Sequence, residues 1–237
     1  MKAIEIKDLK KKYSGKLAVD GLSFSIESGE FFGFLGPNGA GKSTTINSIT
    51  GITKYDSGTI LVNGFDADKD YKDARKQVGL SPQEFNTDFF EKTWKVLDYA
   101  AGYFGMGKKE RKKRVQEVLE QFNLIEHKNK RFTELSGGMK RRLVLARAMI
   151  HNPDILILDE PTAGVDVELR HELWRHLKDL NSKGKTIILT SHYLDEVQKL
   201  CDRVLIINNG KPVAEFSRGE LAHADDLEEK YLRVTQK

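Results

Sequence analysis

The stretch Gly36-Pro37-Asn38-Gly39-Ala40-Gly41-Lys42-Ser43 decides the fold, because it fits the pattern G-x-x-x-x-G-K-[ST] in full. It follows a compact apolar run, Phe31 to Leu35, which predicts a buried strand, and it opens a helical pattern from Lys42 to Ile49. A glycine-rich turn at this place lets backbone N–H groups face phosphate oxygens, and the start of the helix adds the positive end of its dipole. A chance glycine-rich turn would not need both flanks, so the stretch predicts a site for the phosphates of a nucleotide.

The side chains of this loop have separate expected roles. We expect the Lys42 ammonium to reach the β- and γ-phosphates, the Ser43 hydroxyl to bind Mg²⁺, and Thr44 to help hold the α-phosphate. The predicted cofactors are therefore ATP and Mg²⁺, and the predicted reaction is ATP hydrolysis. The expected nucleotide-binding residues of the loop are Gly36, Pro37, Asn38, Gly39, Ala40, Gly41, Lys42, Ser43 and Thr44.

A second motif supplies the carboxylates that such a loop needs. The four apolar residues from Ile155 to Leu158 predict a strand, and Asp159 and Glu160 follow it directly. Ligands of open α/β sheets bind at the carboxyl ends of strands. We expect Asp159 to bind Mg²⁺, mainly through water, and Glu160 to face the γ-phosphate as a general base or to position the attacking water. Alone this pair could merely end a strand, but beside the phosphate loop the catalytic interpretation is favoured.

Strand patterns alternate with helical patterns along much of the chain. The segment from Thr186 to Leu189 is a second short run rich in branched residues, which is typical of an interior strand of a parallel sheet. Leucines at positions 169, 173, 177 and 180 mark one face of a helix that ends near Gly184. Met139, Leu143, Ala146 and Ile150 mark another helix, which Ser136 is placed to cap. Strands alternating with helices predict an α/β fold with a mostly parallel sheet.

The chain is predicted to be one domain, 1–237, with two segments of different character. Residues from about 86 to 133 have helical patterns throughout, which predicts a helical subdomain inserted into the core. Residues from about 218 to 237 are polar and form a C-terminal extension, in which Leu221, Leu227 and Leu232 are candidates for a short helix. Early segments, such as Leu22 to Ile26, alternate apolar and polar residues like strands.

Composition describes an ordinary folded protein without a nucleic-acid footprint. The 237 residues are 39% apolar and 31% charged with a net charge of +4, which argues against disorder. The basic run Lys108 to Arg114 is expected to be a solvated helix face. A single cysteine, Cys201, excludes an internal disulfide and is expected in the core of a protein from a reducing compartment. Because no signal peptide and no stretch near about 20 apolar residues is present, we expect a soluble protein.

A third motif is more specific. The segment Leu135-Ser136-Gly137-Gly138-Met139 resembles the signature of the ATP-binding cassette (ABC) ATPases, and it opens a helix, where Ser136 and glycine N–H groups can bind an anion. In that family the signature of one subunit closes over the γ-phosphate held by the other subunit. The resemblance therefore implies a head-to-tail dimer with a second ATP-binding subunit. We expect a second copy of this chain, and a different ATP-binding chain is the open alternative. It also implies a P-loop NTPase core with an N-terminal antiparallel β segment.

Four further residues match this family in order. Tyr13 matches the aromatic residue that stacks on adenine, with a core tyrosine as the alternative. Gln83 matches the glutamine that contacts Mg²⁺ and the attacking water, although alone it would be an ordinary loop amide. Asp166 matches the loop that touches the other subunit and can also cap the helix that follows. His192, after an apolar strand, matches the histidine that contacts the γ-phosphate, whereas a lone histidine is usually structural.

The resemblance extends from about Ile4 to Phe216, with two departures that leave the expected ATPase activity intact. Met139 stands where the family often has glutamine, and Val165 stands where leucine is common. Within the family the chain looks like an ATP subunit of ABC-2 type exporters, which move drugs, polysaccharides or lipids. Residues 128–134 lack the acidic glycine motif of fused multidrug exporters, which argues against that group.

This resemblance implies partners and a location. We expect two copies to bind the cytoplasmic faces of a separate integral membrane permease, so that the protein is cytoplasmic and peripheral at the inner face of the cell membrane. The candidates for permease contact are Glu84, Phe85, Phe89 and Phe90. Packing inside the helical insertion is an equally open interpretation of these aromatic residues. No nucleic-acid partner is expected, and the transported substrate is not encoded in this chain.

The sequence fits two other classes of function less well. A soluble ABC ATPase acting on nucleic acid or ribosomes would be expected to carry long coiled coils or a second cassette, and this chain has neither. A P-loop GTPase would need a guanine-reading motif such as N-K-x-D, and a kinase would leave the signature and His192 unexplained. The transport ATPase is therefore the leading hypothesis.

Overall fold

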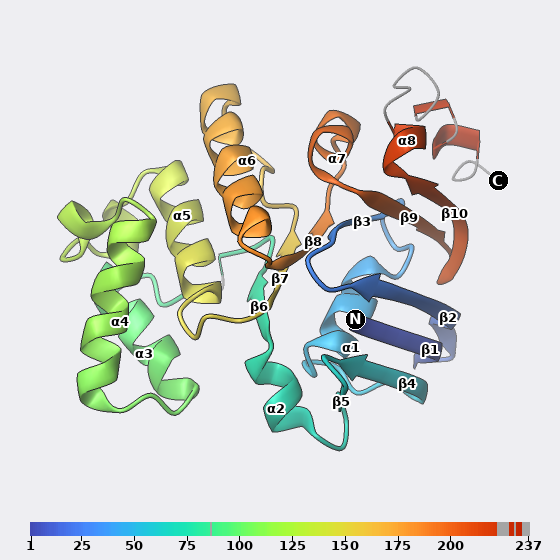
Figure 1. The fold of residues 1–237 in the computed structure, drawn as a ribbon, viewed down its shortest axis with the longest axis horizontal. Helices are drawn as coiled ribbons and strands as arrows, with labels where there is room; N and C mark the ends of the chain where they lie inside the picture. Colours follow the sequence, from blue (N-terminus) through green and yellow to red (C-terminus); the bar gives the residue numbers. More distant parts are fainter. Residues whose placement is uncertain (86, 222–227, 230, 234–237) are drawn as a thin grey trace.

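A six-stranded sheet forms the centre of the molecule in the computed structural model, which describes residues 1–85, 87–221, 228–229 and 231–233 (Figure 1). In sheet order its strands are β10 (Lys211–Ser217), β9 (Arg203–Asn208), β3 (Phe31–Leu35), β8 (Thr186–Thr190), β7 (Ile155–Asp159) and β6 (Val78–Ser81). Neighbouring strands are parallel except β10, which is antiparallel to β9. All residues of β3 and β8 are buried, which explains their unbroken apolar runs and confirms the predicted mostly parallel sheet.

A smaller antiparallel sheet contains the N-terminal strands, as the family resemblance implied. In sheet order it comprises β2 (Lys16–Glu27), β1 (Lys2–Tyr13), β4 (Ser57–Val62) and β5 (Phe65–Asp66). Ser14 and Gly15 join β1 to β2 with positive φ angles of 46° and 89°, which is the backbone of a two-residue hairpin turn. Ile4 and Ile6 lie on the buried face of β1, because alternate residues of a strand point to one side.

Helices cover both sheets. In chain order they are α1 (Lys42–Ile49), α2 (Tyr71–Lys76), α3 (Thr93–Tyr103), α4 (Lys108–Gln121), α5 (Gly137–Ala148), α6 (Val167–Ser182), α7 (Leu194–Leu200) and α8 (Arg218–Leu221). Ile46 and Ile49 of α1 belong to an apolar cluster that includes residues of both sheets, so this helix joins the two sheets. Figure 1 shows α3, α4 and α5 together at one end of the molecule.

The helical segment is present, and its packing is continuous with the core. Residues 93–134 hold α3, α4 and two short 3-10 turns, Ile125–His127 and Phe132–Glu134. One apolar cluster includes residues of α3, α4, α5, α6 and the six-stranded sheet. The division into a single domain with a subdomain at about 86–133 and an extension at about 218–237 stays a prediction. Asn86, Leu227 and most of the proposed extension lie outside the described residues.

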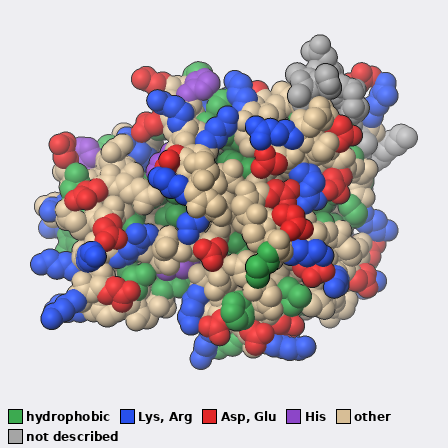
Figure 2. All heavy atoms as spheres, viewed as in Figure 1, with side chains coloured by type: hydrophobic (Ala, Val, Ile, Leu, Met, Phe, Trp, Pro, Cys, Tyr) green, Lys and Arg blue, Asp and Glu red, His purple; other side chains and the backbone are tan. Residues whose placement is uncertain are grey.

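Two further expectations concern the surface and the interior. Cys201 is 2% exposed, as predicted for a small core residue. The four lysines of the basic run on α4 are exposed, and cationic and anionic side chains are interspersed on the face shown in Figure 2. Within the described part of the chain, no helix has the length and apolar character needed to cross a bilayer.

Candidate functional site

The glycine-rich loop lies between the end of β3 and the start of α1, and its backbone requires glycine. Gly36 and Gly41 have φ angles of 154° and 108°, which side chains rarely allow. A Cβ on Gly36 would lie 2.3 Å from the Ile207 carbonyl oxygen, and one on Gly41 would lie 2.5 Å from that of Ala18. The two glycines therefore let the loop pack closely against neighbouring backbone, where the Cβ of any other residue would clash.

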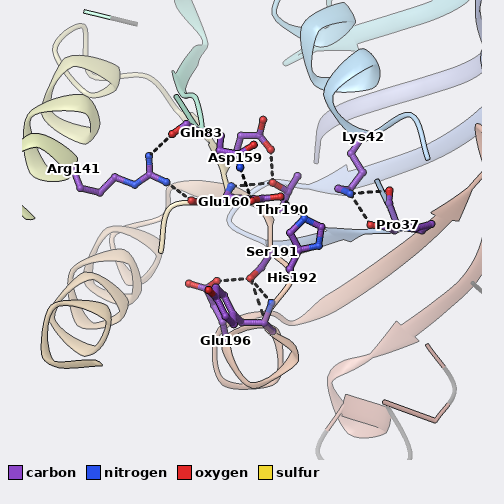
Figure 3. Close-up of polar contacts among 12 residues, drawn as sticks. Pro37, Lys42, Gln83, Arg141, Asp159, Glu160, Thr190, Ser191, His192 and Glu196 are labelled. Atoms are coloured by element: carbon purple, nitrogen blue, oxygen red, sulfur yellow. Dashed lines mark hydrogen bonds and ion pairs between the residues drawn. The ribbon is translucent and has the colours of Figure 1, made fainter. Parts of the chain in front are cut away.

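The Lys42 side chain lies inside this loop. Its ammonium donates hydrogen bonds to the carbonyl oxygens of Gly36, at 2.6 Å, and Pro37, at 3.2 Å, and the residue is 8% exposed. Burial lowers the pKa of the ammonium, while the nearby carboxylates of Glu160 and Asp159 raise it. The cation thus faces the two carboxylates across the centre of the site, as Figure 3 shows.

Gln83 and His192, which the sequence predicted as catalytic residues, both contact the Glu160 carboxylate (Figure 3). The Gln83 side-chain amide donates to Glu160 Oε2 at 2.8 Å, and His192 Nε2 lies 2.5 Å from Glu160 Oε1. These three residues come from the ends of β6, β7 and β8, which are adjacent in the sheet. The carboxyl ends of three strands therefore converge on one carboxylate.

The backbone of Glu160 is unusual. Its φ angle is 48°, a left-handed conformation that costs a non-glycine residue on the order of 1 kcal/mol. Thr190 holds this turn, since the Glu160 N–H donates to the Thr190 carbonyl at 3.2 Å and to its hydroxyl at 3.1 Å. The same hydroxyl donates to Asp159 Oδ1 at 2.5 Å. The sequence did not single out Thr190, so its role in orienting both carboxylates was missed.

The predicted Mg²⁺ ligands have suitable chemistry. Ser43, Gln83 and Asp159 offer a hydroxyl, an amide and a carboxylate oxygen, the donors that Mg²⁺ prefers together with phosphate oxygens. Ser43 is exposed at the start of α1, beside Lys42. No group of three or more His, Cys, Asp or Glu side chains in the described residues could hold a metal. Binding of Mg²⁺ by Ser43, Gln83 and Asp159 stays a prediction.

The signature lies at a separate place, at the N-terminus of α5. Ser136 caps this helix, because its hydroxyl accepts a hydrogen bond from the Met139 N–H at 3.3 Å. Asp166 caps α6 in the same way, accepting from the Leu169 N–H at 2.9 Å, which confirms its predicted capping role. Ser136, Gly137, Gly138 and Asp166 line one hollow of about 410 Å³, and none of its lining residues belongs to the phosphate loop.

Tyr13 lies at the end of β1, and its exposure decides between its two interpretations. The residue is 46% exposed, so the alternative of a core tyrosine is wrong. The Lys11 ammonium lies 5.1 Å from the centre of its ring. Stacking of this ring on adenine stays a prediction.

A buried carboxylate behind the site was not foreseen from the sequence. Glu196 of α7 is fully buried and accepts hydrogen bonds from Thr162 Oγ1 at 3.0 Å, Ser191 Oγ at 2.6 Å and Trp174 Nε1 at 2.8 Å. Burial raises the pKa of its carboxyl group. Ser191 directly precedes His192, so this network fixes the loop that carries the histidine.

Known proteins resemble this chain over most of its length. The family described as "ABC transporter" matches residues 19–163, more than half of the chain. The Nod factor export ATP-binding protein I of Burkholderia thailandensis is 44% identical over 212 residues, which cover 90% of this chain and 70% of that protein. The linearmycin resistance ATP-binding protein LnrL of Bacillus subtilis is 42% identical over 218 residues, which cover 92% of this chain and 70% of that protein.

Solved structures agree with the fold. The ATP-binding cassette MJ0796, as a dimer in a post-hydrolysis state bound to ADP and Pi, matches with a TM-score of 0.82 at 27% identity. The match covers 91% of this chain and 98% of that one. The predicted P-loop NTPase core of the ABC ATPase type is confirmed by this likeness.

Proposed function

The chain belongs to the ABC transporter family, and on that premise we propose that it is the ATP-binding and ATP-hydrolysing subunit that powers a separate membrane permease, of the ABC-2 exporter type. The names of the two relatives refer to export and to resistance, which supports this function over an ABC ATPase acting on nucleic acid or ribosomes. The observation that carries the enzymatic part is the Glu160 carboxylate, which Gln83 and His192 hold at the carboxyl end of β7.

Binding of the nucleotide uses the phosphate loop. The N–H groups of the loop and the start of α1 face the phosphates, and Lys42 exchanges its two carbonyl partners for β- and γ-phosphate oxygens. Tyr13 stacks on adenine from the end of β1. Ser43, Asp159 and Gln83 would hold Mg²⁺, which when bound neutralises charge that develops on the phosphates.

Hydrolysis is an attack of water on the γ-phosphorus. Glu160 either takes the proton of that water as a general base or orients the water by a hydrogen bond, while the water oxygen bonds to the γ-phosphorus and the bond from the γ-phosphorus to the bridging oxygen of ADP breaks. Gln83 orients the same water, and His192 donates to a γ-phosphate oxygen. Thr190 keeps Asp159 and Glu160 in register, because its hydroxyl contacts both.

The signature completes the site in a dimer. Ser136 and the N–H groups of Gly137 and Gly138 lie at a helix N-terminus, which attracts an anion. Since they line a hollow apart from the phosphate loop, the γ-phosphate that they contact is the one held by a second copy. The solved dimer of a related cassette supports this arrangement.

Permease docking is proposed at the segment after β6. Phe90 is 77% exposed and Phe89 is 48% exposed, while Phe85 and Phe89 also place their ring centres 5.5 and 5.4 Å from that of Phe132. Phe85 and Phe89 therefore pack against Phe132, whereas Phe90, the most exposed of the three rings, is the candidate for docking. A permease seated there would place the chain at the inner face of the membrane. Phe90→Ala should reduce co-purification with the permease, whereas Tyr103→Ala, at a residue 92% exposed on α3, should not.

Phosphate release by the purified chain tests the enzymatic proposal. We expect Mg²⁺-dependent release of Pi from ATP that is lost on addition of EDTA and in Lys42→Ala. Lys112→Ala, which removes an exposed ammonium on α4, serves as the matched control. A Lys42→Ala variant that hydrolyses ATP at the rate of the unaltered chain would contradict the proposal.

A further inference from the structure

Arg141 is a buried cation on α5 whose hydrogen bonds all reach backbone carbonyls. The residue is 2% exposed, and among the described residues no carboxylate lies within ion-pair distance of it. Burial lowers the pKa of this guanidinium, because it disfavours the charged form. A buried cation is costly unless its donors are hydrogen-bonded, as they are here. Arginine presents several donors in a rigid planar fork, so one guanidinium can hold several carbonyl oxygens at once.

The fork of Arg141 spans two segments of the site, as Figure 3 shows. Its Nη1 donates to the carbonyl oxygens of Pro82, at 3.1 Å, and Gln83, at 3.3 Å. Its Nε donates to the Pro161 carbonyl and its Nη2 to the Glu160 carbonyl. One guanidinium therefore holds the backbone of both members of the Gln83–Glu160 pair.

The strained turn at Glu160 depends on such support. Its left-handed φ angle persists only where neighbouring groups hold it. Thr190 holds the N–H of Glu160, and Arg141 holds its carbonyl, so the residue is fixed on both sides. Loss of the Arg141 contact would let the backbone relax and would turn the carboxylate away from Gln83 and His192.

The position of Arg141 on α5 links this support to the signature. Ser136 caps α5, and Arg141 follows five residues later, about 7.5 Å along the helix axis. The Lys140 N–H donates to the Ser136 carbonyl at 2.9 Å, so the helix is hydrogen-bonded from its cap through this turn. A displacement of the Ser136 end therefore moves the guanidinium and, with it, both catalytic segments.

We propose that Arg141 is a positioning residue that couples the signature of this chain to its own catalytic pair. This inference rests on the proposed dimer, in which Ser136 contacts the ATP held by the partner copy. Contact at Ser136 fixes the position of α5. The guanidinium of Arg141 then holds Glu160 and Gln83 in position to act on the ATP bound to this chain. ATP bound to one copy thereby affects the catalytic residues of the other copy through α5.

A double-mutant cycle on the full chain tests this coupling. The turnover number, the Kd for ATP and the Tm are measured for the unaltered chain, Ser136→Ala, Arg141→Lys and the double variant. Lysine keeps the charge but loses the fork, so it cannot hold both segments. We expect Arg141→Lys to lower the turnover number by about ten- to a hundredfold, because small misplacements of catalytic groups cost that much. The Kd for ATP should stay within about twofold, since the phosphate loop is untouched.

The coupling itself appears as non-additivity. Ser136→Ala should lower turnover by a larger factor in the unaltered background than in Arg141→Lys, because its direct contact with the partner's ATP is lost in both backgrounds whereas the coupling is lost only in the first. Arg114→Lys is the matched control, since Arg114 of α4 donates to the carbonyls of Ile150, at 2.8 Å, and Met149, at 2.9 Å, at the far end of α5. The effect of Arg114→Lys on the turnover number should add to that of Ser136→Ala.

Three results would overturn the inference. One is additive effects of Ser136→Ala and Arg141→Lys; another is unaltered turnover in Arg141→Lys. The third is a joint fall of Tm and ATP affinity in both Arg141→Lys and Arg141→Gln, which would assign Arg141 a structural role only. A failure of the proposed function looks different, because then the unaltered chain would not hydrolyse ATP or Glu160→Gln would hydrolyse it at full rate.

Discussion

The chain carries two half-sites that are organised in different ways. At the phosphate-loop half-site, side chains bond to one another: Gln83 and His192 hold Glu160, and Thr190 holds Asp159. At the signature half-site, Ser136 and Asp166 cap their own helices and line a hollow of about 410 Å³. On the proposed function, the first half-site carries out the chemistry and the second contacts the ATP held by a partner copy.

Removal of the charge at Glu160 should separate chemistry from binding most strongly. Glu160→Gln is expected to lower the turnover number by about a hundred- to ten-thousandfold, the contribution typical of a general base. The Kd for ATP should change little, because Lys42 and the loop remain. Phosphate release and equilibrium nucleotide binding measure the two quantities, with the exposed Glu126→Gln as control. Equal losses of turnover and of ATP affinity would show that Glu160 is needed for binding as much as for chemistry.

Blocking the signature should affect turnover and leave binding to the single chain intact. Ser136→Arg places a long cation in the hollow, so we expect roughly a hundredfold or larger loss of turnover, comparable to the loss of an oxyanion donor. ATP binding to the monomer should remain, in contrast to Lys42→Ala, which should weaken it. Full turnover in Ser136→Arg would show that the signature half-site takes no part in hydrolysis.

The buried network behind His192 should contribute stability to the phosphate-loop half-site. Glu196→Gln leaves three donors facing a side chain with one acceptor oxygen, so the free energy of unfolding should fall by about 2 kcal/mol. Urea denaturation measures the loss. Glu120→Gln, at an exposed position of α4, should change the free energy of unfolding little. Equal stability of the two variants would show that this network does not hold the histidine loop.

Acid should weaken the support of α5, and so the signature half-site, by a smaller amount. His151 follows α5, stacks on Phe104 with ring centres 3.5 Å apart, and its burial lowers its pKa from 6.5 to about 4. Between these values the unfolded chain binds the extra proton, so stability is complete above about pH 6.5 and falls as the pH drops toward 4. We expect a loss of about 1 to 2 kcal/mol between pH 7.5 and 5.

Urea unfolding at several pH values measures this dependence. His151→Phe should remove most of it, whereas the exposed His171→Phe should not. An unchanged pH dependence in His151→Phe would place the acid-sensitive group elsewhere.

Local patterns predicted much of the phosphate-loop half-site. The bounds of β3 and α1 match the predicted runs Phe31 to Leu35 and Lys42 to Ile49, because a strand, a glycine turn and a helix are specified by adjacent residues. Ser136 and Asp166 were likewise predicted as caps, which depend on the next three residues. Strands β6, β9 and β10 were not predicted, since their short patterns gain meaning only from pairing in the sheet.

The residues that orient the site could not be read from neighbours in the sequence. Arg141 contacts carbonyls 19 to 59 positions away, and Glu196 meets Thr162 from 34 positions away. The left-handed turn at Glu160 gives no signal either, because glutamate carries no preference for it. Such roles arise from tertiary contacts, whereas the motifs that they support are local.

On the proposed function, one complete ATP site requires two copies of the chain. Sedimentation of Glu160→Gln at saturating Mg-ATP tests it directly, because slow hydrolysis should trap the closed state. We predict twice the mass of the single chain with ATP, the mass of the single chain without it, and no dimer when Ser136→Arg is added. A Glu160→Gln chain that binds ATP fully and stays monomeric would show that the ATP site does not need a second copy.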